Sequence, residues 1–207
     1  MREEPSGVKE TPEAPRARYR RQVRDEVQTR AWSQIGQDGV SALSLKAIAT
    51  QMGMTAPALY RYYSSRDELL TELIVSAYQD LAEVAEAAAA GDRPAFERIR
   101  DLSAALRRWA VAQPQRYLLL YGTPVPGHHA PDTAALLAQR IFAPIQAGFA
   151  ELQDESADPS SSSGEHRSLI LWTRLHGVLS LELAGHFVGM NVDADLLYRD
   201  EVASVLR

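Results

Sequence analysis

The sequence contains no cysteine, and this absence excludes several kinds of chemistry. Without thiols the chain has no disulfide bond, no thiol nucleophile and no zinc–thiolate site. It also lacks an apolar run long enough to cross a bilayer, and its first residues do not form an apolar signal segment. We therefore expect a cytoplasmic protein with no membrane partner.

Sequence motifs of enzymes are missing as well. The chain has no phosphate-binding loop, no helical zinc-binding pair and no Gly-x-Ser-x-Gly elbow. His128 and His129 are adjacent in a loop rich in Gly and Pro, and no third metal ligand is evident, so we interpret them as loop residues. Glu182 and His186, four residues apart, are either half of a metal or acid–base site or, as we favour, a polar pair at an interface. We expect no catalytic residue, no metal and no cofactor.

The composition that remains is that of a globular protein with an uneven charge distribution. The 207 residues are 45% hydrophobic and 24% charged, which allows one or two domains with a sizeable core. The net charge is -5, but residues 1–66 carry eleven Lys or Arg against seven Asp or Glu, and the remainder eleven against twenty. A basic N-terminal third on an acidic body is typical of a DNA reader with a separate regulatory part.

Residues 44–66, SLKAIATQMGMTAPALYRYYSSR, predict two short helices joined by a tight turn. Ser44 can cap the first helix, whose apolar residues recur at helical spacing. Gly53 tolerates the left-handed conformation that ends a helix. Thr55 can cap the second helix, and Pro57 fits its first turn, where a missing amide costs little.

The second predicted helix has a surface suited to DNA. It buries Leu59 and Tyr63 and turns residues 60–62, Tyr-Arg-Tyr, outward. A helix in a DNA major groove needs such donors, a cation and flat contact surface. Arg66 begins the next helix, where the helix dipole disfavours a cation, and a phosphate partner would compensate. The alternative is an ordinary helical hairpin whose tyrosines cover a core.

The motif closely resembles the DNA-binding motif of TetR-family transcriptional regulators. The matching residues are Ile48-Ala49, Gly53, Leu59-Tyr60, Tyr63 and Ser65-Arg66, with Tyr63 in place of the commoner Phe and Arg66 in place of the commoner Lys. The resemblance implies that Ser44, Thr55, Tyr60 and Arg66 hold phosphates. Lys46 and Arg61 are the best candidates to reach base edges, and Ala58 can touch a thymine methyl. The predicted DNA-binding residues are Ser44, Lys46, Thr55, Ala56, Ala58, Tyr60, Arg61, Tyr62 and Arg66.

The patterning along the chain predicts an all-α fold of about nine helices. Residues 1–17, rich in Pro, Glu and Arg, should be a disordered tail; residues 18–66 form the helix-turn-helix head and residues 67–207 the body. The arginine-rich run at the start of the first helix is either a solvated face or an arm that contacts DNA. A long helix from Arg66 to near Gly91 should connect head and body mechanically.

The C-terminal part of the chain predicts a homodimer. From Leu169 to Met190 apolar residues cover nearly the whole circumference of one predicted helix, and such a helix is buried on all sides. Trp172, His176-Gly177 and Leu181-Glu182 resemble the Trp-His-Gly type of TetR C-terminal domain, which implies a dimer through the last two helices and a cavity beside them. The predicted interface residues are Gly177, Leu181, Gly185, Val202 and Leu206.

Aromatic residues on the body helices predict an effector pocket, although the same residues can simply fill a core. The predicted lining is Leu81, Val84, Ala88, Trp109, Tyr117, Tyr121, Phe142, Phe149, Trp172 and His176. We therefore expect a transcriptional regulator, by resemblance a repressor, that binds a near-palindromic double-stranded operator as a homodimer. A small, mostly apolar effector of unknown identity would release it. The alternatives are a DNA-binding regulator without a small ligand and an enzyme in the helical body.

Overall fold

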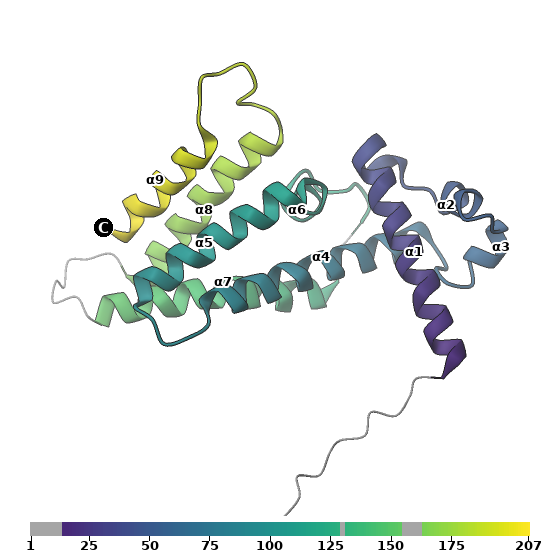
Figure 1. Ribbon diagram of the computed structural model, residues 1–207, viewed down its shortest axis with the longest axis horizontal. Helices are drawn as coiled ribbons and strands as arrows, with labels where there is room; N and C mark the ends of the chain where they lie inside the picture. Colours follow the sequence, from purple (N-terminus) through teal and green to yellow (C-terminus); the bar gives the residue numbers. More distant parts are fainter. Residues whose placement is uncertain (1–13, 129–130, 155–162) are drawn as a thin grey trace, which may run out of the picture. The chain divides into compact units, whose positions relative to one another are not determined.

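The computed structural model describes residues 14–128, 131–154 and 163–207 (Figure 1). Within these residues all regular secondary structure is helical, with nine α-helices and one short 3₁₀ helix, which confirms the expected all-α class. Contacts divide the chain into two compact units, with the boundary between Arg66 and Asp67. We call the first unit the head and the second the body. No helix among the described residues is long and apolar enough to span a membrane.

The head is built on one long helix and three short ones. Its core contains the fully buried side chains of Val27, Ala31, Ile48 and Leu59. Proline lacks an amide that would be unpaired in a first helical turn, and the first helix accordingly begins at Pro15, inside the stretch expected to be disordered. Residues 1–13 of that stretch lie outside the described residues. The elements are α1 (Pro15–Asp38), η1 (Val40–Ala42), α2 (Leu45–Gln51) and α3 (Ala56–Leu59).

The helix that presents residues 60–62 is shorter than predicted. The α-helix ends at Leu59, and the chain continues as a turn in which the Tyr62 amide donates to the Leu59 carbonyl at 2.8 Å. The carbonyl of Tyr62 instead accepts a hydrogen bond from the Arg24 guanidinium at 2.9 Å. Carbonyls at a helix end need such partners, and here side chains of α1 supply them.

The body is a bundle around one continuous core. Helix α8 packs against α9 and α7, and α5 packs against α7; Figure 1 shows α8 and α9 side by side. Fully buried Ile141, Phe149 and Leu171 belong to this core. The elements are α4 (Arg66–Ala89), α5 (Ala95–Ala112), α6 (Pro114–Tyr121), α7 (Asp132–Asp154), α8 (Gly164–Leu183) and α9 (Ala194–Leu206).

The predicted helix from Leu169 to Met190 is wrong at its C-terminal end, because α8 stops at Leu183. Gly185 has a φ of 80°, and the amide of His186 donates back to the Leu181 carbonyl at 2.9 Å. This left-handed glycine with a backward hydrogen bond is a common way to end a helix. It also removes the expected pairing of Glu182 with His186, since the two residues no longer share a helical face.

Candidate nucleic-acid interface and candidate effector site

The two predicted helix caps in the head are confirmed. The Ser44 hydroxyl accepts a hydrogen bond from the Ala47 amide at 3.3 Å, and the Thr55 hydroxyl accepts one from the Ala58 amide at 3.4 Å. The Ser44 amide donates in turn to the Gln34 side chain on α1 at 3.1 Å. A capping hydroxyl uses its oxygen as an acceptor and keeps its proton, so both hydroxyls retain a donor for an anion.

The turn between α2 and α3 has the geometry that its glycine predicted. Gly53 has a φ of 65°, and the Met54 amide donates to the Ala49 carbonyl at 2.9 Å while the Gly53 amide donates to Thr50. These are the two hydrogen bonds of a Schellman motif. The backbone hydrogen bonds of the turn end α2 in a defined geometry, and each cap secures the first turn of its own helix.

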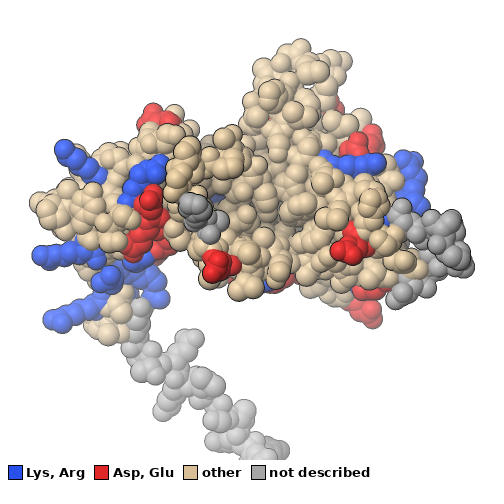
Figure 2. Space-filling model, turned by 180° about the vertical axis from the view of Figure 1, so that it is seen from behind, with Lys and Arg blue, Asp and Glu red and all other residues tan. Residues whose placement is uncertain are grey.

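The predicted DNA-binding residues differ in how they are exposed. Lys46, Thr55, Tyr60 and Arg61 are exposed, and Tyr60 retains 49% of its accessible surface. Figure 2 shows several Lys and Arg side chains projecting together from the head. The partly exposed members of the set are Ser44, Ala56, Ala58, Tyr62 and Arg66. The head thus presents cations and an aromatic ring on a rigid helix-turn-helix.

Arg66 has a role within the head that its sequence position did not reveal. Its Nε donates to the Leu43 carbonyl at 3.1 Å and its Nη2 to the Val40 carbonyl at 2.8 Å. A guanidinium has several N–H donors in a fixed fork, and two of them here secure the segment that contains η1. The predicted phosphate contact of Arg66 stays a prediction.

Arg20 and Arg24 on α1 hold the turn that follows α3. Arg24 donates to the Tyr62 carbonyl, and its guanidinium lies 4.4 Å from the centroid of the buried Tyr63 ring. Arg20 donates to the Arg61 carbonyl at 3.4 Å. The spacing of these arginines along α1 indicates only a solvated face or an arm, because it carries no information about partners 38 to 41 residues away.

In the body, aromatic side chains from two helices meet at His176 on α8. The His176 ring lies 4.3 Å from Tyr121 on α6 and 4.2 Å from Trp172, centroid to centroid. The Tyr117 hydroxyl is 2.9 Å from His176 Nδ1 and 3.1 Å from Ser180 Oγ. We call Tyr117, Tyr121, Trp172 and His176 the aromatic cluster.

The aromatic cluster borders a cavity that is much smaller than an effector. Its volume is about 10 Å³, which is the space of about one water molecule. Six of the predicted lining residues surround it: Leu81, Trp109, Tyr117, Tyr121, Trp172 and His176. Val84, Ala88 and Phe142 pack against the core without lining the cavity, and Phe149 is buried beneath the Arg167 guanidinium. In this conformation the aromatic residues fill the core almost completely.

The aromatic cluster is uncharged near neutral pH. Burial disfavours a charged imidazole and lowers the pKa of His176 to about 4. Burial likewise raises the pKa of Tyr121, whose hydroxyl has no hydrogen-bond partner among the described residues. The cluster therefore offers a molecule apolar surface and one unsatisfied hydroxyl, without an ionic partner.

Asp80 on α4 joins three donors that no sequence pattern connects. Its carboxylate accepts from Trp109 Nε1 at 2.7 Å, Gln113 at 3.2 Å and Arg116 at 3.0 Å. These donors come from α5, α6 and the corner between them, so one carboxylate fastens that corner to α4. Charge-assisted hydrogen bonds of this kind are about twice as strong as neutral ones.

The predicted interface residues fall on two different surfaces. Gly177 and Leu181 are exposed on α8, in a stripe with Leu169 and Thr173, and Leu181 is 46% exposed. Gly185 is exposed in the turn after α8. Val202 does not lie on this stripe, because it is 5% exposed and already buried within its own subunit. Leu206 lies beside it, facing α5.

The loop after α6 holds the two adjacent histidines of the sequence. His129 lies outside the described residues, and the His128 Nε2 atom is buried without a hydrogen-bond partner among those that are described. Across the described ranges, no group of three or more His, Cys, Asp or Glu side chains is arranged to hold a metal ion.

Parts of both the head and the body match known protein families. Residues 29–73 match the family described as bacterial regulatory proteins, tetR family, and residues 99–205 match the tetracyclin repressor-like C-terminal domain. The chain is 39% identical to the HTH-type transcriptional regulator Rv1816 of Mycobacterium tuberculosis H37Rv, over 81% of this chain and 85% of the relative.

Solved structures agree with these relatives. The crystal structure of the regulatory protein SCO4313 is 48% identical, with a TM-score of 0.81, and the match covers 93% of this chain and 99% of that one. The TetR-family regulator PfmR from Thermus thermophilus, at 17% identity and a TM-score of 0.70 over 88% and 98% of the two chains, shares the fold.

Proposed function

The chain belongs to the TetR family of DNA-binding transcriptional regulators, and from this premise we propose that it is a repressor controlled by a small molecule. It binds a near-palindromic operator as a homodimer, because a two-fold protein needs a two-fold DNA site. A small, mostly apolar effector in the body releases it. We also propose that the body has no enzymatic activity, in keeping with relatives that are regulators.

The exposed cations beside the helix-turn-helix carry the DNA-binding part of this proposal. Lys46 and Arg61 are long cations with exposed side chains on elements held by the Gly53 turn and two capping hydroxyls. Arg61 is the residue we assign to a base edge, where a bidentate guanidinium discriminates guanine. Ser44, Thr55 and Tyr60 carry hydroxyls suited to phosphates.

The experiment begins with selection of bound fragments from genomic DNA, which defines the operator. Arg61→Ala should then cost about 1–3 kcal/mol at the preferred base and relax specificity there, with less change on random DNA. Arg140→Ala, an exposed arginine of the body, is the control and should leave both affinities unchanged. Equal weakening on operator and random DNA would show that Arg61 contacts only the backbone.

The aromatic cluster supports the effector part of the proposal, with one condition. A cavity of about 10 Å³ cannot hold a molecule that normally needs about 300–1,000 Å³, so effector binding requires side chains of the cluster to move. A ligand acts only through its differential affinity for the DNA-binding and released states. To move the ratio of released to DNA-binding protein from 1:99 to 99:1, the effector must prefer the released state by about 5.5 kcal/mol.

Linkage gives the test of effector control. Operator DNA must lower effector affinity by the same factor by which the effector lowers operator affinity. A paired titration of each candidate effector, with and without operator, measures both. Equal effector affinities in the two titrations would mean that the compound binds without releasing DNA.

The filled core favours a second candidate function. If the aromatic cluster never opens, the protein is a DNA-binding regulator governed by its abundance or by a partner protein. The observation in favour is the small volume of the cavity. A screen of apolar compounds that leaves the thermal midpoint of the protein unchanged supports this second candidate, since a bound ligand stabilises the folded state.

A further inference from the structure

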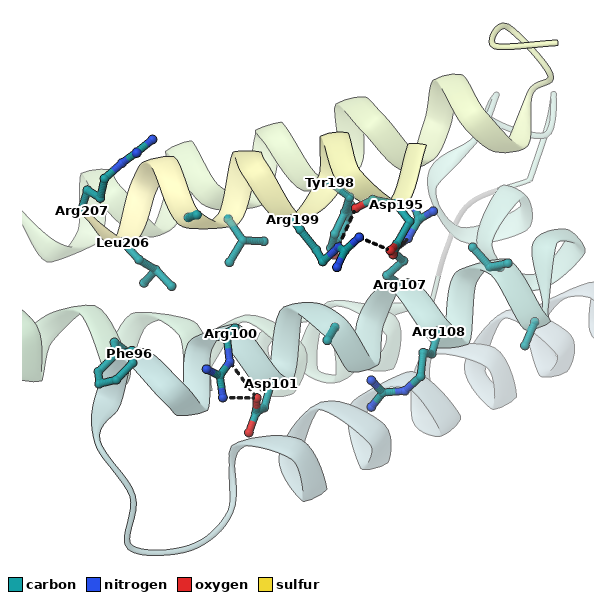
Figure 3. Close-up of a pocket in the computed structure, with 15 residues that line it drawn as sticks. Phe96, Arg100, Asp101, Arg107, Arg108, Asp195, Tyr198, Arg199, Leu206 and Arg207 are labelled. Atoms are coloured by element: carbon teal, nitrogen blue, oxygen red, sulfur yellow. Dashed lines mark hydrogen bonds and ion pairs between the residues drawn. The ribbon is translucent and has the colours of Figure 1, made fainter. Parts of the chain in front are cut away.

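An open groove lies between α5 and α9, and the core residue Tyr198 lines both this groove and the small cavity beside the aromatic cluster. The groove has a volume of about 860 Å³, far larger than the cavity at His176. In Figure 3, Phe96 lies near Leu206 at one end, and Arg108 lies near Asp195 and Arg107 at the other, so the two helices run antiparallel. At 1.5 Å per residue, the lining of α5 from Phe96 to Ala112 extends over roughly 24 Å.

The floor of the groove is apolar. Ala104 and Val202 lie along it, and Phe96 and Val111, near the two ends of the α5 lining, remain 45% and 46% exposed. Contiguous exposed apolar surface rimmed by polar groups marks interaction sites on soluble proteins. The size and shape are those of a groove that receives the apolar face of a helix.

The rims of the groove carry an excess of positive charge within an acidic body. The lining contains five arginines and two aspartates, whereas residues 67–207 have eleven Lys or Arg against twenty Asp or Glu. Arg100 and Arg108 are eight residues apart on α5, and Arg199 on α9 is eight residues before Arg207, which directly follows that helix. Eight residues of helix extend over about 12 Å, and each rim therefore carries arginines at two separate points.

The two aspartates pair with three of the five arginines, and Arg107 is also paired with Glu182 on α8. Asp101 is shared between Arg93 and Arg100, and Asp195 between Arg107 and Arg199. Arg108 makes no ion pair or hydrogen bond through its side chain with any residue in the described part of the chain. Arg108 therefore presents to the groove a guanidinium that no residue in the described ranges pairs with.

The charges along the groove distinguish between three possible occupants of the groove. A second copy would place this surface against itself in a two-fold interface, and like charges would then face one another. A single-chain amphiphile carries its charge at one end and would meet only one of the arginine pairs. An amphipathic helix with acidic residues on both sides of its apolar stripe matches the floor and both rims.

We propose that the groove between α5 and α9 is a docking site for an acidic amphipathic helix supplied by a partner protein. The partner's apolar residues at i, i+3, i+4 and i+7 lie on Ala104, Val111 and Leu206, and its carboxylates reach the arginines of the rims. This proposal is independent of the effector and gives the regulator a second input through the body.

The test uses a synthetic, fluorescein-labelled helical peptide of about 15 residues, long enough to span roughly 22 Å. Leucines form its apolar stripe and glutamates flank it, and two matched peptides carry glutamine or lysine in place of glutamate. Binding to the full-length protein is measured by fluorescence anisotropy. We expect saturable binding of the glutamate peptide that weakens with added salt, and at least tenfold weaker binding of the glutamine peptide.

Three variants locate the site. Arg108→Glu should weaken binding of the glutamate peptide about tenfold and strengthen binding of the lysine peptide. It breaks no ion pair among the described residues of the subunit. Ala104→Trp fills the floor of the groove without changing its charge and should weaken binding of both peptides. Arg140→Glu makes the same charge change at Arg140, which pairs with Glu86 away from the groove, and should change neither. Thermal unfolding of each variant confirms that it is folded.

Four results would overturn the proposal. The first is that the glutamate peptide shows no saturable binding, and the second is that the glutamate and glutamine peptides bind equally. The third is that Arg108→Glu binds the glutamate peptide as tightly as the wild type, and the fourth is evidence for another occupant of the groove. If Arg108→Glu or Ala104→Trp converts a dimer to a monomer in sedimentation, a second copy fills the groove. If dodecyl phosphate binds in the groove and the glutamate peptide does not, the occupant of the groove is an amphiphile.

Discussion

Two side chains of the aromatic cluster, His176 and Tyr121, show how burial sets the chemistry of single residues. An imidazole and a phenol are polar groups, yet both are packed among aromatic rings. Burial keeps each in its neutral form. Both consequences can be measured in the free energy of unfolding. For His176 this free energy should depend on pH, and for Tyr121 it should reflect the missing hydrogen bond.

His176 should make the protein less stable in mild acid. Burial lowers its folded pKa to about 4 from an ordinary 6.5, so its contribution to stability is complete above pH 6.5 and is lost as pH falls toward 4. The loss is on the order of 3 kcal/mol. His176→Gln retains a hydrogen-bond acceptor for Tyr117 and removes the titration.

Chemical denaturation from pH 7.5 to 4 checks this. Carboxylates contribute equally to both proteins, so the difference between wild type and His176→Gln isolates the imidazole. We expect that difference to change with pH between 6.5 and 4. Parallel stability curves would mean that His176 protonates in the folded state without cost.

Tyr121→Phe should stabilise the protein. The variant removes a buried hydroxyl that has no partner among the described residues, and leaving such a group unpaired costs about 1–3 kcal/mol. We expect a gain of about 1 kcal/mol in the free energy of unfolding. Tyr117→Phe is the matched control and should be destabilising, since the Tyr117 hydroxyl is bonded to His176 and Ser180. A loss of stability in Tyr121→Phe would show that its hydroxyl has a water partner.

At the scale of one element, α8 presents an exposed stripe with a glycine at its centre. Leu169, Thr173, Gly177 and Leu181 follow one another every four residues, so they lie on one face. A side chain added at Gly177 meets no atom of the subunit within 4 Å. Glycine in a helix is destabilising relative to alanine, and close approach of a second helix would explain its presence here.

Gly177→Ala should therefore have opposite effects on the subunit and on the dimer. In a monomeric background, alanine should raise the free energy of unfolding by about 0.5–1 kcal/mol through helix propensity. In the dimer, the added methyl should separate the two helices and raise the dissociation constant about tenfold, or about 1.4 kcal/mol. Denaturation and sedimentation measure the two effects. A more stable subunit with unchanged dimerisation would move the interface away from this stripe.

At the scale of the whole molecule, dimerisation through α8 should control operator affinity. Leu181→Arg places a charge in the proposed apolar interface, which has no partner for it. We expect a folded monomer with normal helix content by circular dichroism. Its operator affinity should fall by about 10²-fold or more, because the two half-sites no longer bind heads that are linked.

Leu136→Arg is the control for that variant. Leu136 is 63% exposed on α7, outside the stripe, and its replacement should leave sedimentation and operator binding unchanged. If Leu181→Arg remains dimeric, the assembly uses another surface. The operator half-sites should lie about 34–36 Å apart, or at multiples of that distance, for two heads to bind one face of the duplex.

Local rules in the sequence determined the fold class, the family and the backbone geometry of the head. The caps at Ser44 and Thr55 and the left-handed turn at Gly53 depend on residues within a few positions of one another, so their chemistry can be inferred without a structure. Apolar periodicity likewise located most of the helices, because it follows from the 3.6-residue repeat. The early end of α8 was not predicted because the apolar pattern continues through a turn whose two left-handed glycines stop the helix.

Tertiary structure alone decided which side chains meet. The bonds from Arg24 to Tyr62 and from Asp80 to Trp109, Gln113 and Arg116 join residues 29 to 38 positions apart, and periodicity carries no information about such partners. The sequence supplied enough aromatic residues for a pocket, but only close packing determined that they leave about 10 Å³. The groove between α5 and α9 arises in the same way, because arginines 91 to 107 positions apart become neighbours only when two antiparallel helices are brought together.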